Sequence, residues 1–204
     1  MYVPEAFRLD DPLRIAEVMR TFDFALLVTA PDSRPQASHL PFMYDPESGP
    51  HGRLLAHMAR ANPQWRHFAQ LAEAGQEALV IFQGPHSYIS PTWYGEGPPS
   101  VPTWNYVAVH AYGLPRVIEA AAEVRGLLDR LVAVQEEGLS PPWSSADVPE
   151  NFVTGMQRGL VAFEIPVSRL EAKAKLSQNK TAAQQAAATA VVEQAEDFLA
   201  RATG

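Results

Sequence analysis

The sequence predicts a mainly β protein with flanking helices, of the α+β class, built as a small closed or partly open β-barrel. Short runs of β-branched and aromatic residues recur along the chain, and turns rich in proline and glycine separate them. Only short helical patterns stand between these runs, which is typical of small barrels. With 204 residues and 47% hydrophobic content, the chain can bury one full core.

The first half of the chain has the clearest element boundaries. Pro12, after two aspartates, predicts the start of a helix. Pro41 removes a backbone donor, so its strand is expected at a sheet edge or at a bulge. Asn62 as cap and Pro63 at the first helical position predict a helix that ends near Ala74. The predicted strands cover residues 24–30 and 36–44, which form a hairpin, and 53–58.

The second half continues the barrel and adds helices. Further strands are predicted over residues 77–83, 105–114 and 160–166, and helices over 118–138 and 151–158. We expect a barrel domain at 1–180 with a helical insertion around 118–158, followed by a C-terminal amphipathic helix at 181–204. The apolar residues of that last helix have helical spacing: Val191, Val192, Ala195, Phe198 and Leu199.

Composition excludes several classes of function. The formal net charge of −7 argues against a surface devoted to nucleic-acid phosphates. The absence of cysteine removes disulfides and thiol chemistry, and the six histidines lack metal-binding spacing. No hydrolase or nucleotide-binding motif is present, so no catalytic residue is predicted. With no apolar run of membrane length and no signal-peptide pattern, we expect a cytoplasmic protein without a membrane anchor.

The segment 83–110 is unusual for a connection between strands. It holds Tyr88, Trp93, Tyr94 and Trp104 among five prolines and three glycines. A long connection with this composition is usually functional. The aromatic rings could stack on a planar cofactor or form a subunit interface, and packing beneath the loop is the competing explanation.

Two polar segments are candidate ligand sites. His57 and Arg60 end a strand just before the helix capped by Asn62, an arrangement that favours an anion. An ordinary strand-to-helix turn explains the same spacing, and on spacing alone it is the better explanation. The segment 177–180, Ser-Gln-Asn-Lys, could donate hydrogen bonds to a polar ligand or could cap the terminal helix.

Six motifs in order give the sequence a family resemblance. They are MYVPEAF at the start, SHLPF at 38–42, HMARANPQW at 57–65, IFQGPHSYISPTWY at 81–94, VPTWNYVAVHAYG at 101–113 and KLSQNK at 175–180. Together they resemble the PaiB family of FMN-binding negative transcriptional regulators. The resemblance implies a split β-barrel of the flavin-reductase and pyridoxamine-oxidase type, which works as a homodimer with FMN at the subunit interface.

The resemblance also implies which residues contact the cofactor. Trp104 would face the cofactor, whereas Tyr88, Trp93 and Tyr94 would build the subunit contact. The first subunit would contribute Ser38, His39, Leu40, His57, Arg60 and Asn62. The partner subunit would contribute Thr103, Trp104, Asn105, Lys175, Ser177, Gln178 and Asn179.

Several functions are compatible with this site. The first is an FMN-binding repressor whose flavin controls its association with DNA or with another regulator. The alternative is an FMN-dependent oxidoreductase acting on a small molecule, in which the flavin carries the chemistry. A haem-handling role, with His39, His57 and His110 available, and a degenerate barrel without flavin are the remaining possibilities.

Overall fold

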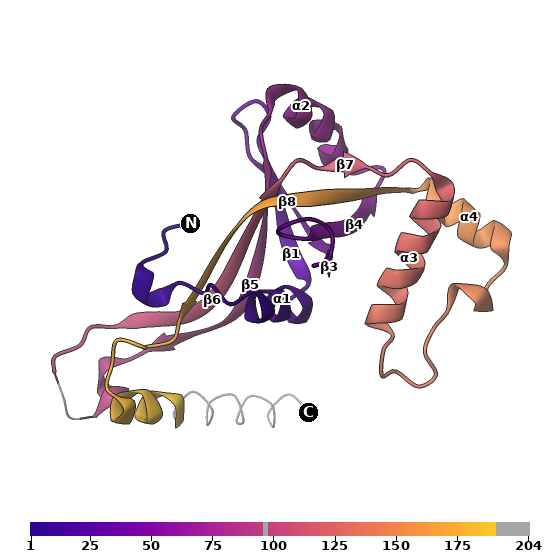
Figure 1. The fold of residues 1–204 in the computed structure, drawn as a ribbon. Helices are drawn as coiled ribbons and strands as arrows, with labels where there is room; N and C mark the ends of the chain where they lie inside the picture. The colour runs from indigo at the N-terminus through magenta and orange to yellow at the C-terminus, as the bar shows by residue number, and fades with distance from the viewer. Residues whose placement is uncertain (96–97, 191–204) are drawn as a thin grey trace. The chain divides into compact units, whose positions relative to one another are not determined.

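The computed structural model describes residues 1–95 and 98–190, which form two compact units. The barrel unit contains residues 16–82 and 110–170. The terminal unit contains residues 1–15, 83–109 and the chain from 171 onward. Within the described residues, eight strands form one sheet with the order β2-β1-β5-β6-β8-β4-β3, and β7 pairs with β8 (Figure 1).

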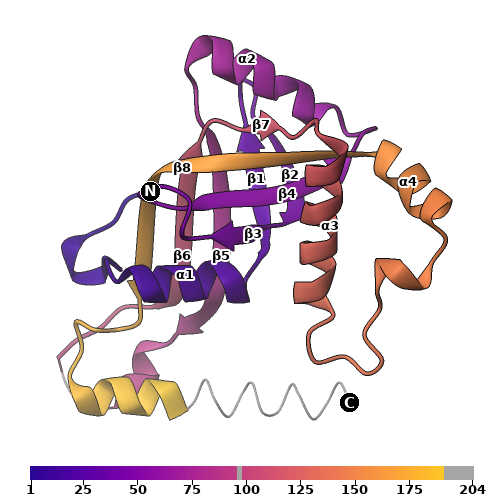
Figure 2. The ribbon, with the colours of Figure 1, turned by 45° about the vertical axis from the view of Figure 1, so that its right-hand side comes forward.

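The strands of the sheet differ widely in length. Strand β1 is antiparallel to β2 and β5, and β4 is antiparallel to β3 and β8. Figure 2 shows β3, β4 and β8 side by side. The bounds are β1 Phe24–Thr29, β2 Gln36–Pro41, β3 Met43–Asp45, β4 Arg53–Ala59, β5 Ala78–Ile89, β6 Thr103–Gly113, β7 Arg116–Val117 and β8 Leu160–Lys175.

An aromatic cluster forms the centre of the barrel unit. The ring of Phe42 lies 6.1 Å from those of Phe82 and Phe163, both in edge-on geometry. Phe68 approaches Phe163 to 5.0 Å between ring centroids. The rings of Phe42, Phe82 and Phe163 are essentially inaccessible to solvent. Edge-to-face pairs of this kind add to the stability that burial of the rings provides.

The helices in the first half of the chain start at the proline positions that the sequence predicts. In α1, Pro12–Thr21, Asp11 accepts a hydrogen bond from the backbone N–H of Leu13 at 3.0 Å. Asn62 caps the short helix η2, Pro63–Arg66, which leads into α2, His67–Ala74. Gly75 ends α2 with a φ of 61°, a conformation that favours glycine.

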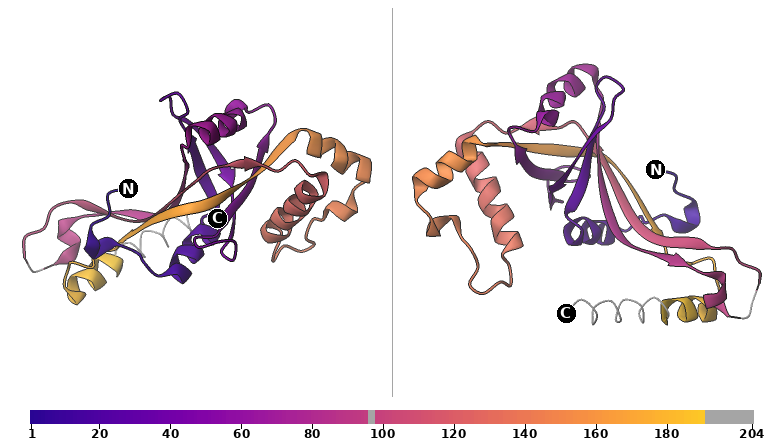
Figure 3. Two further views of the ribbon diagram at one scale, coloured as in Figure 1. Left: turned by 45° about the horizontal axis from the view of Figure 1, so that its top comes forward. Right: turned by 180° about the vertical axis from the view of Figure 1, so that it is seen from behind.

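The predicted helical insertion forms part of the barrel unit. It contains α3, Ala121–Gln135, then η4, Ser145–Asp147, and α4, Glu150–Arg158. Leu127 and Leu131 of α3 pack on Leu55 of β4 and Ala162 of β8. Helices α3 and α4 lie together in Figure 3. The prediction of a single helix from 118 to 138 was too long, because β7 and its turn precede α3.

The N-terminal segment packs inside the terminal unit. It carries the short helix η1, Glu5–Phe7. The backbone N–H of Leu9 donates to the carbonyl of Ala172 at 3.1 Å, and Arg8 forms a β-bridge with Lys173. The N-terminal ammonium contacts Glu171. These bonds hold the first residues of the chain along the end of β8.

A small second core lies in the terminal unit. Ile89, Tyr94 and Ala188 pack together, with Trp93 beside them. Tyr94 belongs to the short helix η3, Pro91–Tyr94, and Ala188 to the helical residues 182–190. Of the predicted C-terminal helix, the apolar positions from Val191 to Leu199 lie outside the described residues.

Three strand predictions need correction. Strand β5 continues to Ile89, so the first part of the aromatic segment is strand and not loop. Gly84 allows β5 to pass close to Val107 of β6, because any other residue would place a Cβ only 3.1 Å from Cβ of Val107. Strand β8 continues to Lys175. The predicted strand ended at residue 166, but the chain continues as strand, and Lys173 is buried beside the rings of Tyr2 and Tyr106.

The third correction concerns the predicted strand at 36–44. It divides into β2 and β3 at Phe42, whose backbone N–H donates to the carbonyl of Asp23 at 2.8 Å. The expected edge position of Pro41 is confirmed, since it ends β2 at one end of the sheet. No helix among residues 1–95 and 98–190 is long and apolar enough to cross a membrane.

Replacing Phe163 tests the aromatic core. The variant Phe163→Ala should lose about 3 to 5 kcal/mol of unfolding free energy, because it removes a ring that is 0% exposed and leaves a cavity. Urea denaturation measures the change. Phe152→Ala is the control, since Phe152 of α4 is 55% exposed and should change stability little. Equal effects of both variants would contradict this assignment of the core.

Candidate functional site

The junction between β4 and η2 brings two of the sequence motifs together. The side-chain amide of Asn62 donates to the hydroxyl of Ser38 on β2 at 2.8 Å. The oxygen of the same amide accepts the backbone N–H of Gln64 at 3.0 Å. Asn62 therefore caps the helix and also fixes its start against the edge strand. The sequence predicted both residues, and the structure joins them.

Gln64 is the residue of this junction that sequence reasoning missed. Its side chain is 0% exposed, and its amide nitrogen donates to the carbonyls of Leu27 and Gln36 at 3.1 and 3.0 Å. The hydroxyl of Thr29 also lies 3.1 Å from that nitrogen and 2.9 Å from Nδ1 of His67. Its place in the motif HMARANPQW was the only signal that could have identified it.

Two nitrogens of the Arg60 guanidinium group are hydrogen-bonded to backbone carbonyls. Its Nε donates to the carbonyl of Arg158 at 2.9 Å, and its Nη2 donates to that of Leu160 at 2.7 Å. These carbonyls lie at the end of α4 and the start of β8, where a cation is favourable. Arg60 therefore holds α4 to the barrel unit. It is also exposed, so its remaining donors are available to an anion.

His57 has an unusual environment on β4. Its Nδ1 atom is buried and has no hydrogen-bond partner among the described residues. Burial of the side chain lowers the pKa of His57 below its ordinary value of 6.5. The ring is therefore neutral at pH 7 and supplies no positive charge for a phosphate.

The other two predicted residues of β2 have different surroundings. His39 is exposed and stacks on Phe24 of β1, with the ring centroids 6.1 Å apart and the planes 24° apart. Leu40 is half-buried and pairs with Ala25 of β1. Both residues lie on the edge strand that carries Ser38.

The residues of the second half of the chain that were predicted to contact the cofactor lie in the terminal unit. The ammonium of Lys175 donates to the hydroxyl of Thr103 and, at 2.7 Å, to the carbonyl of Trp104. Burial lowers the pKa of Lys175; Tyr106 opposes this shift, and the positive charge of Lys173 adds to it. The motifs VPTWNYVAVHAYG and KLSQNK, about seventy residues apart, thus form one cluster.

Asn105 and Ser177 form a second pair of residues from the same motifs. The hydroxyl of Ser177 donates to Oδ1 of Asn105 at 3.0 Å and lies 3.0 Å from the hydroxyl of Tyr94. Gln178 bonds locally, since it accepts the N–H of Leu176 at 2.7 Å and donates to the carbonyl of Ala174. Asn179 is exposed.

The aromatic residues of the terminal unit do not divide into a cofactor-facing Trp104 and a separate group for the subunit contact. Tyr88 lies 5.9 Å from Trp104 and 6.0 Å from Trp93 between ring centroids, so the three rings form one cluster. His86 approaches Trp104 to 6.3 Å. The expectation that Tyr94 builds a subunit contact was wrong, because Tyr94 is only 3% exposed and belongs to the core of this unit.

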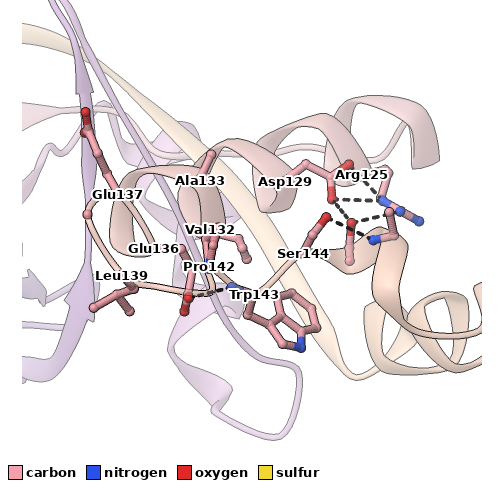
Figure 4. Close-up of a pocket in the computed structure, with 13 residues that line it drawn as sticks. Arg125, Asp129, Val132, Ala133, Glu136, Glu137, Leu139, Pro142, Trp143 and Ser144 are labelled. Carbon is pink, nitrogen blue, oxygen red and sulfur yellow. Dashed lines mark hydrogen bonds and ion pairs between the residues drawn. The ribbon is translucent and has the colours of Figure 1, made fainter.

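A separate cavity of about 810 Å³ lies between α3 and the loop after it (Figure 4). None of the predicted cofactor contacts lines this cavity. Glu136 accepts the backbone N–H of Trp143 at 2.8 Å. Among the described residues that line it, the one basic side chain is Arg125, which is paired with Asp129 at 2.9 Å and Glu150 at 3.1 Å. This cavity therefore lacks a free cation for a flavin phosphate.

Comparison with solved structures identifies the class of fold. The "FAD and Heme binding protein from Mycobacterium smegmatis" superposes with a TM-score of 0.62 at 17% identity, over 89% of this chain and 79% of that one. The "Flavocytochrome Anf3 from Azotobacter vinelandii" gives 0.56 at 14% identity, over 85% and 72% of the two chains. The expected split β-barrel with flanking helices is confirmed.

The family follows from sequence comparison. Residues 1–169 match the family described as "Putative FMN-binding domain", and the chain belongs to it. A relative, the "Protease synthase and sporulation protein PAI 2" of Bacillus subtilis, is 35% identical over 180 residues, covering 88% of this chain and 83% of the relative. The resemblance to PaiB proteins is thereby confirmed. In residues 1–95 and 98–190, no cluster of three or more metal-ligating side chains occurs.

The buried ring of His57 should make stability depend on pH. Because its pKa is lowered in the folded state, the unfolded chain binds the proton first as the pH falls below about 6.5. Stability should therefore decline from pH 7.5 to pH 5.5, and His57→Asn should reduce that decline. Urea denaturation at both pH values measures it. An unchanged difference in the variant would show that His57 titrates normally.

Proposed function

We propose that this protein binds FMN, with the phosphate at the junction of β4 and η2. The Ser38–Asn62 hydrogen bond carries this proposal, because it unites the two motifs that the family resemblance assigns to the cofactor. Two polar groups around that junction suit an anionic ligand. They are the capped helix start and the remaining donors of Arg60.

We further propose that FMN lies between two copies of the chain. The second copy would supply the cluster of Thr103, Trp104 and Lys175. The exposure of Trp104, 53%, and of Tyr88, 41%, supports this, since exposed aromatic rings favour a contact with a partner or a planar ligand. Bound FMN supplies one- and two-electron redox chemistry. The chain's own residues bind the phosphate and cover the ring.

The best-supported role is that of a flavin-dependent regulator that acts through a protein partner. The name of the Bacillus subtilis relative refers to protease synthesis and sporulation, both regulated processes. The net charge of −7 argues against direct contact with DNA phosphates. A band shift with DNA at low salt would therefore contradict the indirect form of this role.

An FMN-dependent oxidoreductase is the second candidate, because a bound flavin itself carries redox chemistry. The protein loaded with FMN should then oxidise NADH faster than free FMN does at the same concentration. Absorbance at 340 nm measures the rate, and a rate equal to that of free FMN would exclude NADH as the electron donor.

Arg60 provides the direct test of the phosphate site. Arg60→Ala should weaken FMN binding by about 1 to 3 kcal/mol, the range for a charge-assisted hydrogen bond. Quenching of flavin fluorescence gives the affinity, and analytical ultracentrifugation with and without FMN gives the oligomeric state. Arg158→Ala is the matched control, because it removes the same charge from an exposed position on α4.

Thermal unfolding must accompany this comparison, since Arg60 also bonds to the carbonyls of Arg158 and Leu160. An Arg60→Ala variant that is folded and has unchanged FMN affinity would show that the phosphate binds elsewhere. A wild-type protein that binds no FMN at all would remove the proposed function.

A further inference from the structure

A second cavity, of about 260 Å³, lies within the terminal unit. Its walls come from β5, β6, the turn after β8 and the helical residues 182–190, so four separate segments build it. Ligand cavities for drug-sized molecules usually exceed about 300 Å³, so this one suits a molecule of one or two rings. Its lining is Pro85, His86, Ser87, Ile89, Asn105, Leu176, Ser177, Gln185, Ala188 and Thr189.

Two residues of the lining, Ser177 and Asn105, are joined by a hydrogen bond. Ser177 is 5% exposed and has a φ of 64°, a conformation that is uncommon for residues other than glycine. Backbone strain of this kind persists where the surrounding contacts enforce it, and it concentrates at functional sites. Here the hydroxyl of Tyr94 and Oδ1 of Asn105 hold the Ser177 side chain from two sides.

Most of the β5 residues that line the cavity face away from the aromatic cluster. Pro85, Ser87 and Ile89 are alternate residues and all line the cavity. Tyr88 points to the opposite face of the strand, where it meets Trp104. His86 also lines the cavity and approaches Trp104 to 6.3 Å, so the cavity borders the cluster of exposed rings.

The polar groups of the lining define the ligand chemistry. Oδ1 of Asn105 accepts from Ser177, and its Nδ2 amino group makes no hydrogen bond among the described residues. Gln185 donates its Nε2 to the carbonyl of Lys180 at 2.9 Å, which leaves its Oε1 as an acceptor. The lining thus offers a donor and an acceptor on different elements.

Among the described residues, the lining contains no Asp, Glu, Lys or Arg. A charged ligand would therefore enter without an opposite charge to compensate for its lost hydration. The phosphate of FMN is such a group. The apolar walls formed by Pro85, Ile89, Leu176 and Ala188 favour the body of an uncharged molecule.

We propose that this cavity binds a small uncharged molecule that carries a carboxamide or lactam group. The ligand carbonyl accepts from Nδ2 of Asn105, and the ligand N–H donates to Oε1 of Gln185. This site goes beyond the proposed FMN site, and it gives Asn105 and Ser177 a role other than contact with the cofactor. The protein would then respond to a second small molecule besides the flavin.

Ligand-observed NMR on the full-length, flavin-free protein tests this site. Nicotinamide and uracil are the probes, and nicotinate is the charged comparator of the same ring size. We expect saturation transfer to both amide probes and at least about tenfold weaker binding of nicotinate. Equal binding of nicotinate, or no binding of either amide probe, would overturn the proposal.

Two variants locate the bound probe. Thr189→Trp places a large side chain at an exposed residue of the lining and should abolish probe binding, whereas Ala186→Trp, on the same helix but outside the lining, should preserve it. Asn105→Asp keeps the acceptor for Ser177 but removes the donor, so it should weaken binding at unchanged melting temperature. Probe binding that survives Thr189→Trp would place the probe elsewhere.

Competition with FMN separates this proposal from the previous one. If FMN displaces nicotinamide, the cavity belongs to the flavin site and the present proposal fails. If FMN does not bind at all while nicotinamide still does, only the FMN proposal fails. Simultaneous binding of both is the result that we expect.

Discussion

The barrel unit depends on the buried amide of Gln64. Its nitrogen bonds to the carbonyls of Leu27 and Gln36 and to the hydroxyl of Thr29, so one side chain joins β1, the start of β2 and η2. The Oε1 atom of Gln64 is buried without a hydrogen-bond partner among the described residues, so the arrangement depends on the bonds of Nε2, and a shift would leave these donors unpaired as well. The position of Asn62 beside Ser38, and hence the proposed phosphate site, follows from that constraint.

The two groups of residues that we propose to contact the cofactor belong to different compact units. Each group is organised by bonds within its own unit, through Asn62 in one and through Lys175 in the other. A flavin that lies between two copies of the chain would contact one group of residues from each copy. It also explains why an acidic chain needs its cations at particular places, since Arg60 and Lys175 bond to backbone carbonyls that orient them.

Sequence patterns predicted much of this structure where local chemistry decides it. The cap at Asn62, the edge position of Pro41 and the strand at 24–30 depend on neighbouring residues, and the structure has them. The patterns failed where distant contacts decide. Lys173 reads as a surface residue, but it is buried beside Tyr2 and Tyr106, more than sixty residues away in the chain. The roles of Gln64 and of the carbonyls that bind Arg60 likewise require the fold.

The central claim is that FMN binds at the junction of β4 and η2. Backbone amide chemical shifts of the ¹⁵N-labelled protein, followed during addition of FMN, test it most directly. We predict that the largest shifts occur at Ser38, Asn62 and Gln64, together with a second group at Thr103, Trp104 and Lys175. Shifts confined to the lining of the cavity beside α3, with none at Ser38 or Asn62, would contradict the account.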